Sequence, residues 1–258
     1  MRFFEELGMS IASRYEQANF DSSSLPDIAA EALGRSRPHD HVTFTMILEQ
    51  AMAGDVPVQV NPYSAFGEPD ITLFTHPRFF IQALFWTTGT TAVHEHSFSG
   101  AFSVLQGSSI QTRFDFRETL RVNAQVLLGE LVVRDVRLLA QGDIESIQSG
   151  RALIHSVFHL DCPSVTLVVR TVKDVDAGPQ YSYHRPHLAV DPFSEDYITH
   201  KRLQTLATLR KIDVATYERY AERAVSRYDF YTAVRVLMAH DPAATQESRE
   251  RLIEACRK

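Results

Sequence analysis

The sequence predicts a mainly β protein, a sandwich or barrel, with α-helical segments added at both ends. Three observations support this fold class. Between about residues 56 and 190 apolar and polar residues alternate with a period of two, and Gly or Pro interrupts the alternation at short intervals. Apolar residues recur at helical spacing before and after this region. Because the turns are closely spaced, an antiparallel sandwich or barrel is favoured over a βαβ array.

We accordingly divide the chain into a helical segment at residues 1–55, a barrel at 56–190 and a second helical segment at 191–258. In the first segment Phe4, Leu7 and Ile11 follow helical spacing, the run of serines at 22–24 predicts a break and a new helix start, and a further helix is predicted from His41 to Met52. We expect this segment to pack on the barrel.

The central region shows two kinds of strand. Ile110 and Phe114 alternate with Gln111 and Arg113, which predicts one apolar and one polar face. The stretch 79–86 is apolar on both faces, so we expect it to lie between two layers.

After residue 192 the helical period returns, for example at Leu206, Tyr217 and Tyr220. These residues would expose a large apolar stripe if the helices were free, so we expect the helices to fold as one unit with the barrel. Arg219, Arg223 and the arginine at 227 lie four residues apart and predict a solvated charged face.

Composition excludes several classes of protein. The net charge is -6, so a nucleic-acid partner is not expected, because phosphate binding requires a basic excess. No apolar run approaches the roughly 20 residues that span a bilayer, so no membrane partner is expected. Glu5 and Glu6 stand where a signal peptide would be apolar, and Cys162 and Cys256 are too few for a disulfide framework. We therefore expect a cytoplasmic protein.

Two histidines carry the main chemical signal. His94 and His96 are two positions apart, which on a strand points both imidazoles to the same face. Imidazoles that converge in this way can bind a metal ion.

The residues around this pair resemble the first motif of the cupin superfamily. That motif runs Gly, five residues, His-x-His, three or four residues, Glu, six residues, Gly; here the first spacer has four residues, and Gly100 or Ala101 stands at the place of the glutamate. The second cupin motif, which adds a histidine from a later hairpin, resembles residues 142–155 and ends at His155, without its usual proline. The resemblance implies a cupin barrel, the double-stranded β-helix or jelly roll.

A site of three histidines without the glutamate is similar to that of the cysteine dioxygenase-like branch of the cupins, where ferrous iron binds a thiol substrate and oxygen. The Phe-rich strand at 102–107 and the strand at 163–167 also match that branch. The resemblance implies that His94, His96 and His155 bind Fe(II), with His155 facing the pair across the barrel. Three neutral imidazoles on one face of an octahedron leave the opposite face open for substrate and oxygen.

The chain departs from that branch on the strand after the third ligand. The family's Ser-His-Tyr relay is replaced by Thr166, Val168 and Arg170, and we therefore expect free cysteine to be a poor substrate. If this face lines the cavity, Arg170 becomes a candidate catalytic residue that binds an anion.

His159 is the second candidate catalytic residue. It follows His155 by four positions and shares its face if the strand is unbroken, so it could donate to the site or act as a fourth ligand. The alternative is a strand-end histidine that is hydrogen-bonded through Asp161.

The leading hypothesis is a mononuclear non-haem Fe(II) oxygenase that acts on a small organic substrate. Zn, Mn or Ni would instead indicate an isomerase, hydratase or hydrolase, since three histidines plus water also form a hydrolytic zinc site. A third reading is a cupin that senses a ligand without turnover. Because cupins commonly associate through barrel edges, the resemblance also implies a homodimer.

Overall fold

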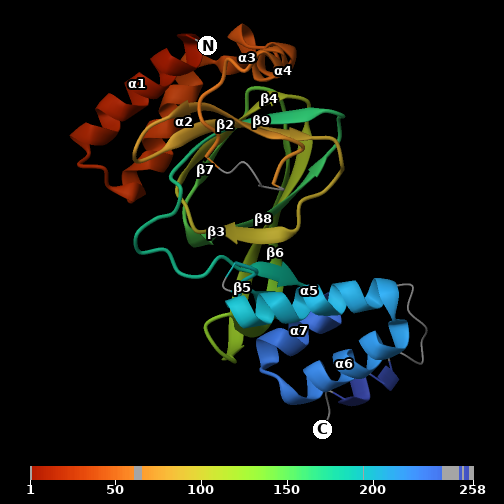
Figure 1. The fold of residues 1–258 in the computed structure, drawn as a ribbon. Coiled ribbons are helices and arrows are strands. Elements are labelled where there is room, and N and C mark those ends of the chain that lie inside the picture. The colour runs from red at the N-terminus through yellow and green to blue at the C-terminus, as the bar shows by residue number, and fades with distance from the viewer. Residues whose placement is uncertain (1, 61–65, 194, 240–249, 252, 256–258) are drawn as a thin grey trace.

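The computed structural model describes residues 2–60, 66–193, 195–239, 250–251 and 253–255. Helices lie at the two ends of the chain and two β-sheets form the centre (Figure 1). The predicted fold class, a jelly-roll barrel with helical additions at both ends, is confirmed. Among the helices within these ranges, none is long and apolar enough to cross a membrane. Cys162 is exposed and free, whereas Cys256 lies outside the described residues.

The N-terminal part is helical and its breaks lie close to the predicted ones. Its elements are α1 (Arg2–Gln17), the 3-10 helix η1 (Ser22–Ser24), α2 (Leu25–Ser36), α3 (Pro38–His41) and α4 (Phe44–Ala53). Helix α4 begins three residues later than the sequence predicts because Thr43 caps it: the Thr43 hydroxyl accepts a hydrogen bond from the backbone N–H of Met46.

Eleven strands form two antiparallel sheets within the described ranges. They are β1 (Asp70–Thr75), β2 (Phe80–Trp86), β3 (Val93–His96), β4 (Gly100–Gln106), β5 (Ser109–Arg121), β6 (Val126–Leu139), β7 (Ile144–Ile147), β8 (Gly150–His159), β9 (Ser164–Arg170), β10 (Ser182–His184) and β11 (Leu188–Val190). One sheet has the order β1-β2-β9-β4-β7, and the other closes on itself in the order β10-β11-β6-β5-β8-β3. The pairs β2–β9, β3–β8, β4–β7 and β5–β6 are those of a jelly roll.

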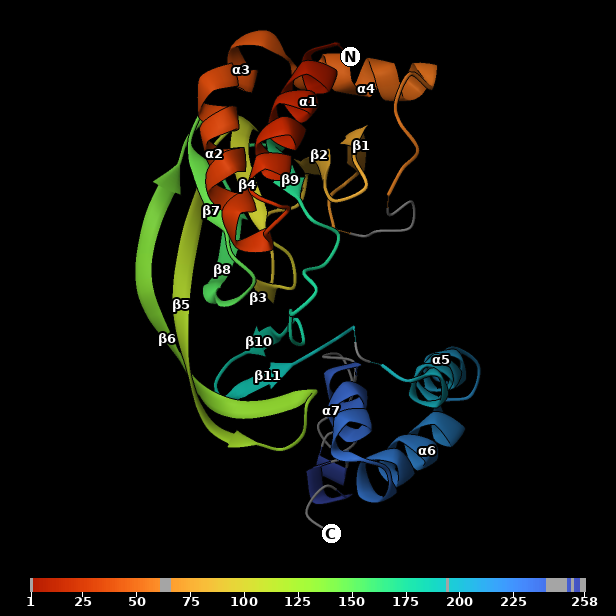
Figure 2. The same cartoon turned by 90° about the vertical axis from the view of Figure 1, so that its left-hand side faces the viewer.

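Strand β2 lies between two layers, as its apolar sequence predicts. Its outward residues Ile81, Ala83 and Phe85 pack against the N-terminal helices in one buried cluster that includes Phe4 of α1. Its inward residue Leu84 packs in a second cluster, inside the barrel. Helices α1 and α2 therefore cover the outer face of the five-stranded sheet (Figure 2). Its inner face lines a pocket.

The apolar face of β5 is buried only in part, and its polar face is buried as well. Ile110 is 37% exposed, whereas Gln111 is fully buried and Phe114 is buried as well. The register of β5 against β6 shifts between Arg113 and Phe114, which marks a β-bulge. The extra residue is Arg134 of β6, and β5 pairs with β8 without interruption, so the alternation of β5 continues. Gln111, opposite Val157, therefore lies on the face that lines the pocket, and Phe114 packs with Ile154 and Tyr183 on the other face.

The C-terminal helices α5 (Tyr197–Ile212), α6 (Val214–Arg227) and α7 (Phe230–Ala239) pack on one another around a cluster that includes Leu206 and Tyr217. Helix α7 also contacts the end of the barrel, where Tyr231 and Val234 pack with Val126. That this segment folds as one unit with the barrel stays a prediction.

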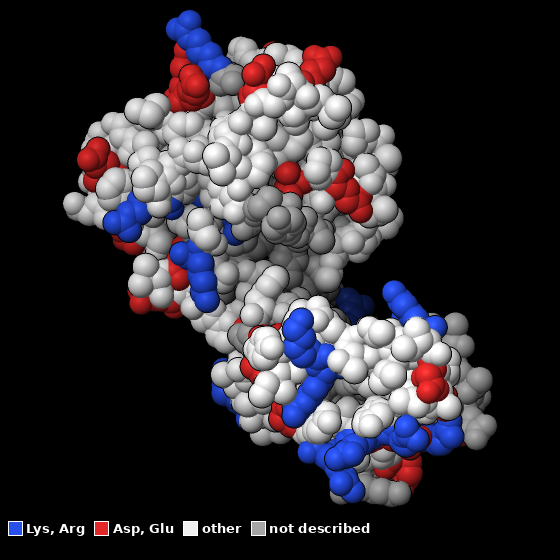
Figure 3. Space-filling model, in the orientation of Figure 1, with Lys and Arg blue, Asp and Glu red and all other residues white. Residues whose placement is uncertain are grey.

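The predicted charged face of α6 is confirmed, since Arg219, Arg223 and Arg227 are exposed. Tyr220, which we expected in the buried stripe, is 43% exposed. Lys and Arg side chains gather on the C-terminal helices in the view of Figure 3.

Candidate metal centre

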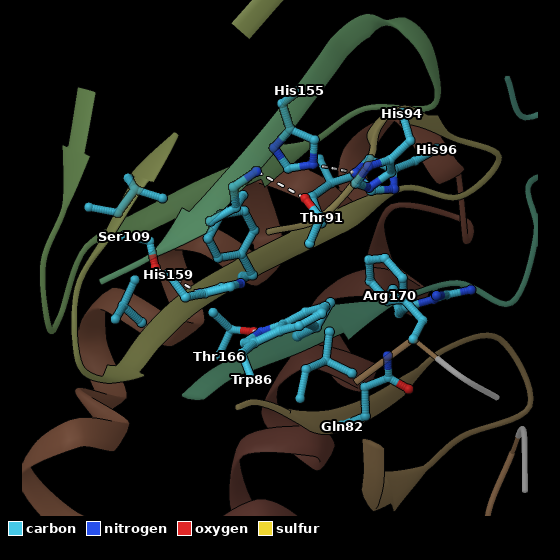
Figure 4. A pocket seen from close by; sticks show the side chains of 18 of the residues that line it. Gln82, Trp86, Thr91, His94, His96, Ser109, His155, His159, Thr166 and Arg170 are labelled. Atoms are coloured by element: carbon cyan, nitrogen blue, oxygen red, sulfur yellow. Dashed lines mark hydrogen bonds between the residues drawn. The ribbon is translucent and has the colours of Figure 1, made fainter. Parts of the chain in front are cut away.

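Three buried histidines from two neighbouring strands converge inside the barrel (Figure 4). His94 and His96 lie on β3 and His155 on β8, and their ligand atoms all lie within 4.8 Å of one another. The expectation that His155 faces the pair across the barrel is wrong. Strands β3 and β8 are hydrogen-bonded neighbours, with His94 directly opposite His155, so the three imidazoles share one wall of the pocket.

The hydrogen bonds of the three rings differ. His94 Nδ1 lies 2.8 Å from the carbonyl oxygen of Ala92, which can only accept, so Nδ1 carries the hydrogen and Nε2 holds a free lone pair. His94 Nε2 is buried and has no hydrogen-bond partner. His96 Nε2 and His155 Nε2 are 3.1 Å apart.

All three imidazoles are held neutral. Burial lowers the pKa of His94 and holds the pKa of His96 and His155 well below the usual value, and the neighbouring imidazoles act in the same direction on the latter two. The neutral imidazole is the form that binds a metal ion.

These residues fit a divalent transition metal. Two nitrogen ligands at about 2.1 Å from one metal ion lie about 3 Å apart, close to the separation between the Nε2 atoms of His96 and His155. The unpartnered Nε2 of His94 supplies a third donor. No Asp or Glu is found among the described residues that line the inner pocket, so the donor set there is neutral.

Gly100 and Ala101 stand at the place where the resemblance expects a glutamate. Ala101 is fully buried on the outer face of β4, in the cluster under the N-terminal helices. A side chain at Gly100 would overlap the carbonyl oxygen of Val169 on the neighbouring strand β9. Neither position can deliver a carboxylate to the histidines. The ring of Phe98 lies beside them instead, 4.6 Å from the ring of His96.

The histidines stand where two cavities meet. The inner one is about 50 Å³ and lies between the two sheets, with mostly apolar walls that include Leu84, Phe102 and Val168. The outer one is about 580 Å³ and opens toward the segment 173–180. His94, His96, Phe98, Gln82 and Arg170 line both of them.

Arg170 lies where the two cavities join. The anion-binding role predicted for Arg170 requires its strand face to line the cavity. It does, because Thr166, Val168 and Arg170 all line the inner pocket. The guanidinium lies 3.5 Å from the centre of the Phe98 ring and donates hydrogen bonds of 3.1 Å to the carbonyl oxygens of residues 171 and 172. These contacts hold the guanidinium in place. Burial lowers the pKa of Arg170 to about 10, so the side chain stays positive at neutral pH.

His159 lies deeper in the inner pocket. Its ring stacks on Trp86, with 4.8 Å between ring centres and 14° between planes, and Nδ1 is 2.9 Å from the hydroxyl of Ser109. Nε2 is buried and unpartnered, and burial lowers the pKa to about 4.

Neither detailed prediction for the surroundings of His159 holds. Among the described residues His159 is outside the cluster of metal-ligand atoms, so it is not a fourth ligand. Asp161 does not bond to it and accepts a hydrogen bond from Ser108 instead.

Sequence reasoning missed one polar network behind the metal centre. Gln111 contacts His155, Arg137 contacts Gln111, and the buried Glu145 pairs with both Arg113 and Arg137. Alternation assigns Gln111 to the polar face of its strand, and only the pairing of β5 with β8 shows that this face is buried at the pocket.

No protein-family model matches the chain, and no curated protein matches it either. Among solved structures the chain is similar to KdgF from a Halomonas species, with 16% identity and a TM-score of 0.29 over 42% of this chain and 80% of that one. It is also similar to a cupin-2 domain protein from Shewanella frigidimarina, with 12% identity and a TM-score of 0.31 over 51% and 94% of the two chains. A cupin superfamily protein from Desulfitobacterium hafniense has 15% identity and a TM-score of 0.28 over 46% and 91%. Similarities of this size do not define an activity.

Proposed function

We propose that the protein is a metal-dependent oxygenase of the cupin type, in which His94, His96 and His155 hold Fe(II) and the substrate is a small organic anion. One observation carries this proposal: three neutral, buried imidazoles, one with an unpartnered Nε2, converge at the junction of an apolar cavity and a wider one. Ferrous iron held there would supply the redox chemistry that oxygen activation requires.

The walls of the inner pocket keep water away from the reacting atoms. Phe98, Phe102 and Val168 are buried and line it, and no carboxylate among the described lining residues neutralises the cation. A neutral ligand set leaves a ferrous ion with its full charge, which favours an anionic substrate over a neutral one.

Arg170 binds the anionic group of the substrate. Its guanidinium is fixed by Phe98 and two carbonyl oxygens, so little side-chain freedom is lost when a carboxylate pairs with it. His159 then forms a hydrogen bond through its free Nε2 with a polar group at the inner end of the substrate. Free cysteine is a poor substrate, because Val168 and Arg170 stand where the thiol dioxygenases carry the relay histidine and tyrosine.

Oxygen uptake by the metal-reconstituted protein tests the proposal. Protein prepared without metal is loaded with Fe(II), Zn(II), Mn(II) or Ni(II) and offered a panel of carboxylates and thiols under air. We expect one equivalent of metal per chain and oxygen uptake with Fe(II) only. His94→Ala should lose the metal, whereas His200→Ala, at a side chain that is 53% exposed, should retain it.

Two outcomes would contradict the proposal. Turnover with zinc in the absence of oxygen would indicate a hydrolase or isomerase, and ligand binding without any turnover would indicate a sensor. The cytoplasmic location and the homodimer also remain predictions; gel filtration with light scattering tests the second.

A further inference from the structure

A chain of four hydrogen-bonded side chains leads from the surface of the barrel to the metal centre. Arg137 Nε donates to Gln111 Oε1 over 3.0 Å, Gln111 Nε2 lies 2.9 Å from His155 Nδ1, and His155 Nε2 lies 3.1 Å from His96 Nε2. Gln111 is fully buried and His155 is 4% exposed, so water does not compete for these bonds.

The direction of each bond follows from the first. A guanidinium nitrogen can only donate, so the amide oxygen of Gln111 faces Arg137 and the amide nitrogen faces His155. The amide nitrogen also only donates, and His155 Nδ1 therefore accepts. A neutral imidazole that accepts at Nδ1 carries its hydrogen on Nε2, from which it donates to His96.

This hydrogen is on the atom that points to the metal centre. His94 has the opposite arrangement, since its Nδ1 donates to a carbonyl oxygen and its Nε2 is free to bind. The three imidazoles of the metal-free site are therefore not equivalent: His94 is ready to ligate through Nε2, and His155 is not.

We propose that Gln111, oriented by Arg137, is a positioning residue that controls metal loading through the tautomer of His155. The inference rests on the proposed metal site. His155 can bind through Nε2 only after its hydrogen moves to Nδ1, where it needs an acceptor. The acceptor is the amide oxygen of Gln111, which reaches His155 when the amide turns over.

When the Gln111 amide turns over, its nitrogen faces Nε of Arg137. Both atoms are hydrogen-bond donors, so they cannot bond to each other. Arg137 must withdraw, and its position permits this: its side chain is 40% exposed, and the buried Glu145 keeps a second partner in Arg113. Metal binding is thus coupled to release of Arg137 from Gln111, so the arginine lowers the affinity of the site for metal. Changes next to a ligating histidine commonly alter metal affinity 10- to 100-fold.

Nitrogen-15 NMR of the metal-free protein at neutral pH tests the tautomers directly. We expect the hydrogen of His155 on Nε2 and that of His94 on Nδ1. In Gln111→Glu the carboxylate can only accept, so the hydrogen of His155 should move to Nδ1. A wild-type His155 with its hydrogen on Nδ1 would overturn the inference, whether or not the protein binds metal.

Zinc affinity, measured by competition with a chromophoric chelator, tests the coupling. We expect Arg137→Met to raise the affinity about tenfold. Arg113→Met is the matched control, because it removes the same charge and the same Glu145 partner without touching Gln111. Arg113 lies directly opposite His155, so this variant reports the effect of charge alone, and its affinity should rise clearly less than that of Arg137→Met. Equal increases in both variants would show a pure charge effect and overturn the inference.

If neither the wild type nor these variants binds zinc, the metal site itself fails, and the tautomer measurement still decides the role of Gln111. Should Arg137→Met fold poorly, Gln111→Glu replaces it. This variant gives His155 an acceptor without displacing Arg137, so its zinc affinity should rise by tenfold or more, and an unchanged affinity would count against the inference.

Discussion

Gly100 is the position at which the barrel should be least tolerant of a side chain. It begins β4 directly opposite Arg170 of β9. A Cβ atom there would overlap the carbonyl oxygen of Val169 and would lie 2.9 Å from the Cα of Arg170. These atoms belong to the backbone of a strand that is paired on both sides, by β2 and β4, so no rotamer change relieves the contact.

The expected cost of Gly100→Ala follows from these contacts. Overpacking against backbone costs about 3 kcal/mol at the upper end of its usual range. Parting β4 from β9 at this point loses one hydrogen bond, about 1 kcal/mol. Replacing Gly by Ala also lowers the conformational entropy of the unfolded chain, which stabilises the folded state by about 0.7 kcal/mol. The free energy of unfolding should therefore fall by about 3 kcal/mol.

Urea unfolding measures this fall, followed by circular dichroism and by the fluorescence of Trp86, the only tryptophan of the chain. Gly178→Ala is the matched control, because nothing lies within 4 Å of its Cβ position and its backbone conformation suits any residue. It should stay within about 0.5 kcal/mol of the wild type. If Gly100→Ala proves as stable as this control, the close approach of β4 and β9 does not exist.

Three further predictions concern buried charge and the helical ends. The pKa of His159 falls from 6.5 to about 4 on folding, so the folded state resists protonation and stability is lost as the pH falls through this window, by about 3 kcal/mol. Urea unfolding at pH 7 and at pH 4 measures this loss. Between the two pH values the free energy of unfolding of His159→Gln should fall by about 3 kcal/mol less than that of the wild type, and equal falls would contradict the assignment. Glu145→Gln should lower the free energy of unfolding by about 2 kcal/mol, because it leaves two partly exposed arginines without their buried partner. Glu130→Gln, in an exposed ion pair, is the control and should change this free energy by less than about 0.5 kcal/mol. Similar changes in the two variants would contradict the prediction. A chain cut after Val190 should be insoluble or altered in its association because α7 covers the end of the barrel, and a soluble fragment of equal stability would refute this.

The parts of the structure that could be predicted are those fixed by local pattern. Spacing alone placed the helix break before α2, and the two apolar faces of β2 correctly placed that strand between layers. The separation of His94 and His96 by two positions correctly put both imidazoles on one face of β3.

The parts that could not be predicted depend on how strands pair. Periodicity does not say which strands are neighbours, so His155 was expected across the barrel although β8 lies beside β3. The alternation of β5 does not say which of its two faces lines the pocket, and the polar one does: Gln111 lies opposite Val157 of β8 and is buried beside His155. The polar network behind the site was missed for this reason.

If the proposed function is correct, the same geometry should make metal and substrate bind cooperatively. A divalent cation held by three neutral imidazoles, with the guanidinium of Arg170 at the same junction, would put excess positive charge beside the apolar inner pocket, which Asp70 in the outer cavity offsets only in part. An anionic substrate compensates that charge, and a buried charge without a partner is costly. Coupling between two ligands is reciprocal. The bound metal should therefore raise the affinity for the anion by the same factor by which the bound anion raises the affinity for the metal. Arg170→Met removes one of the two cations that attract the anion, so it should weaken substrate binding while leaving metal affinity without substrate unchanged or increased.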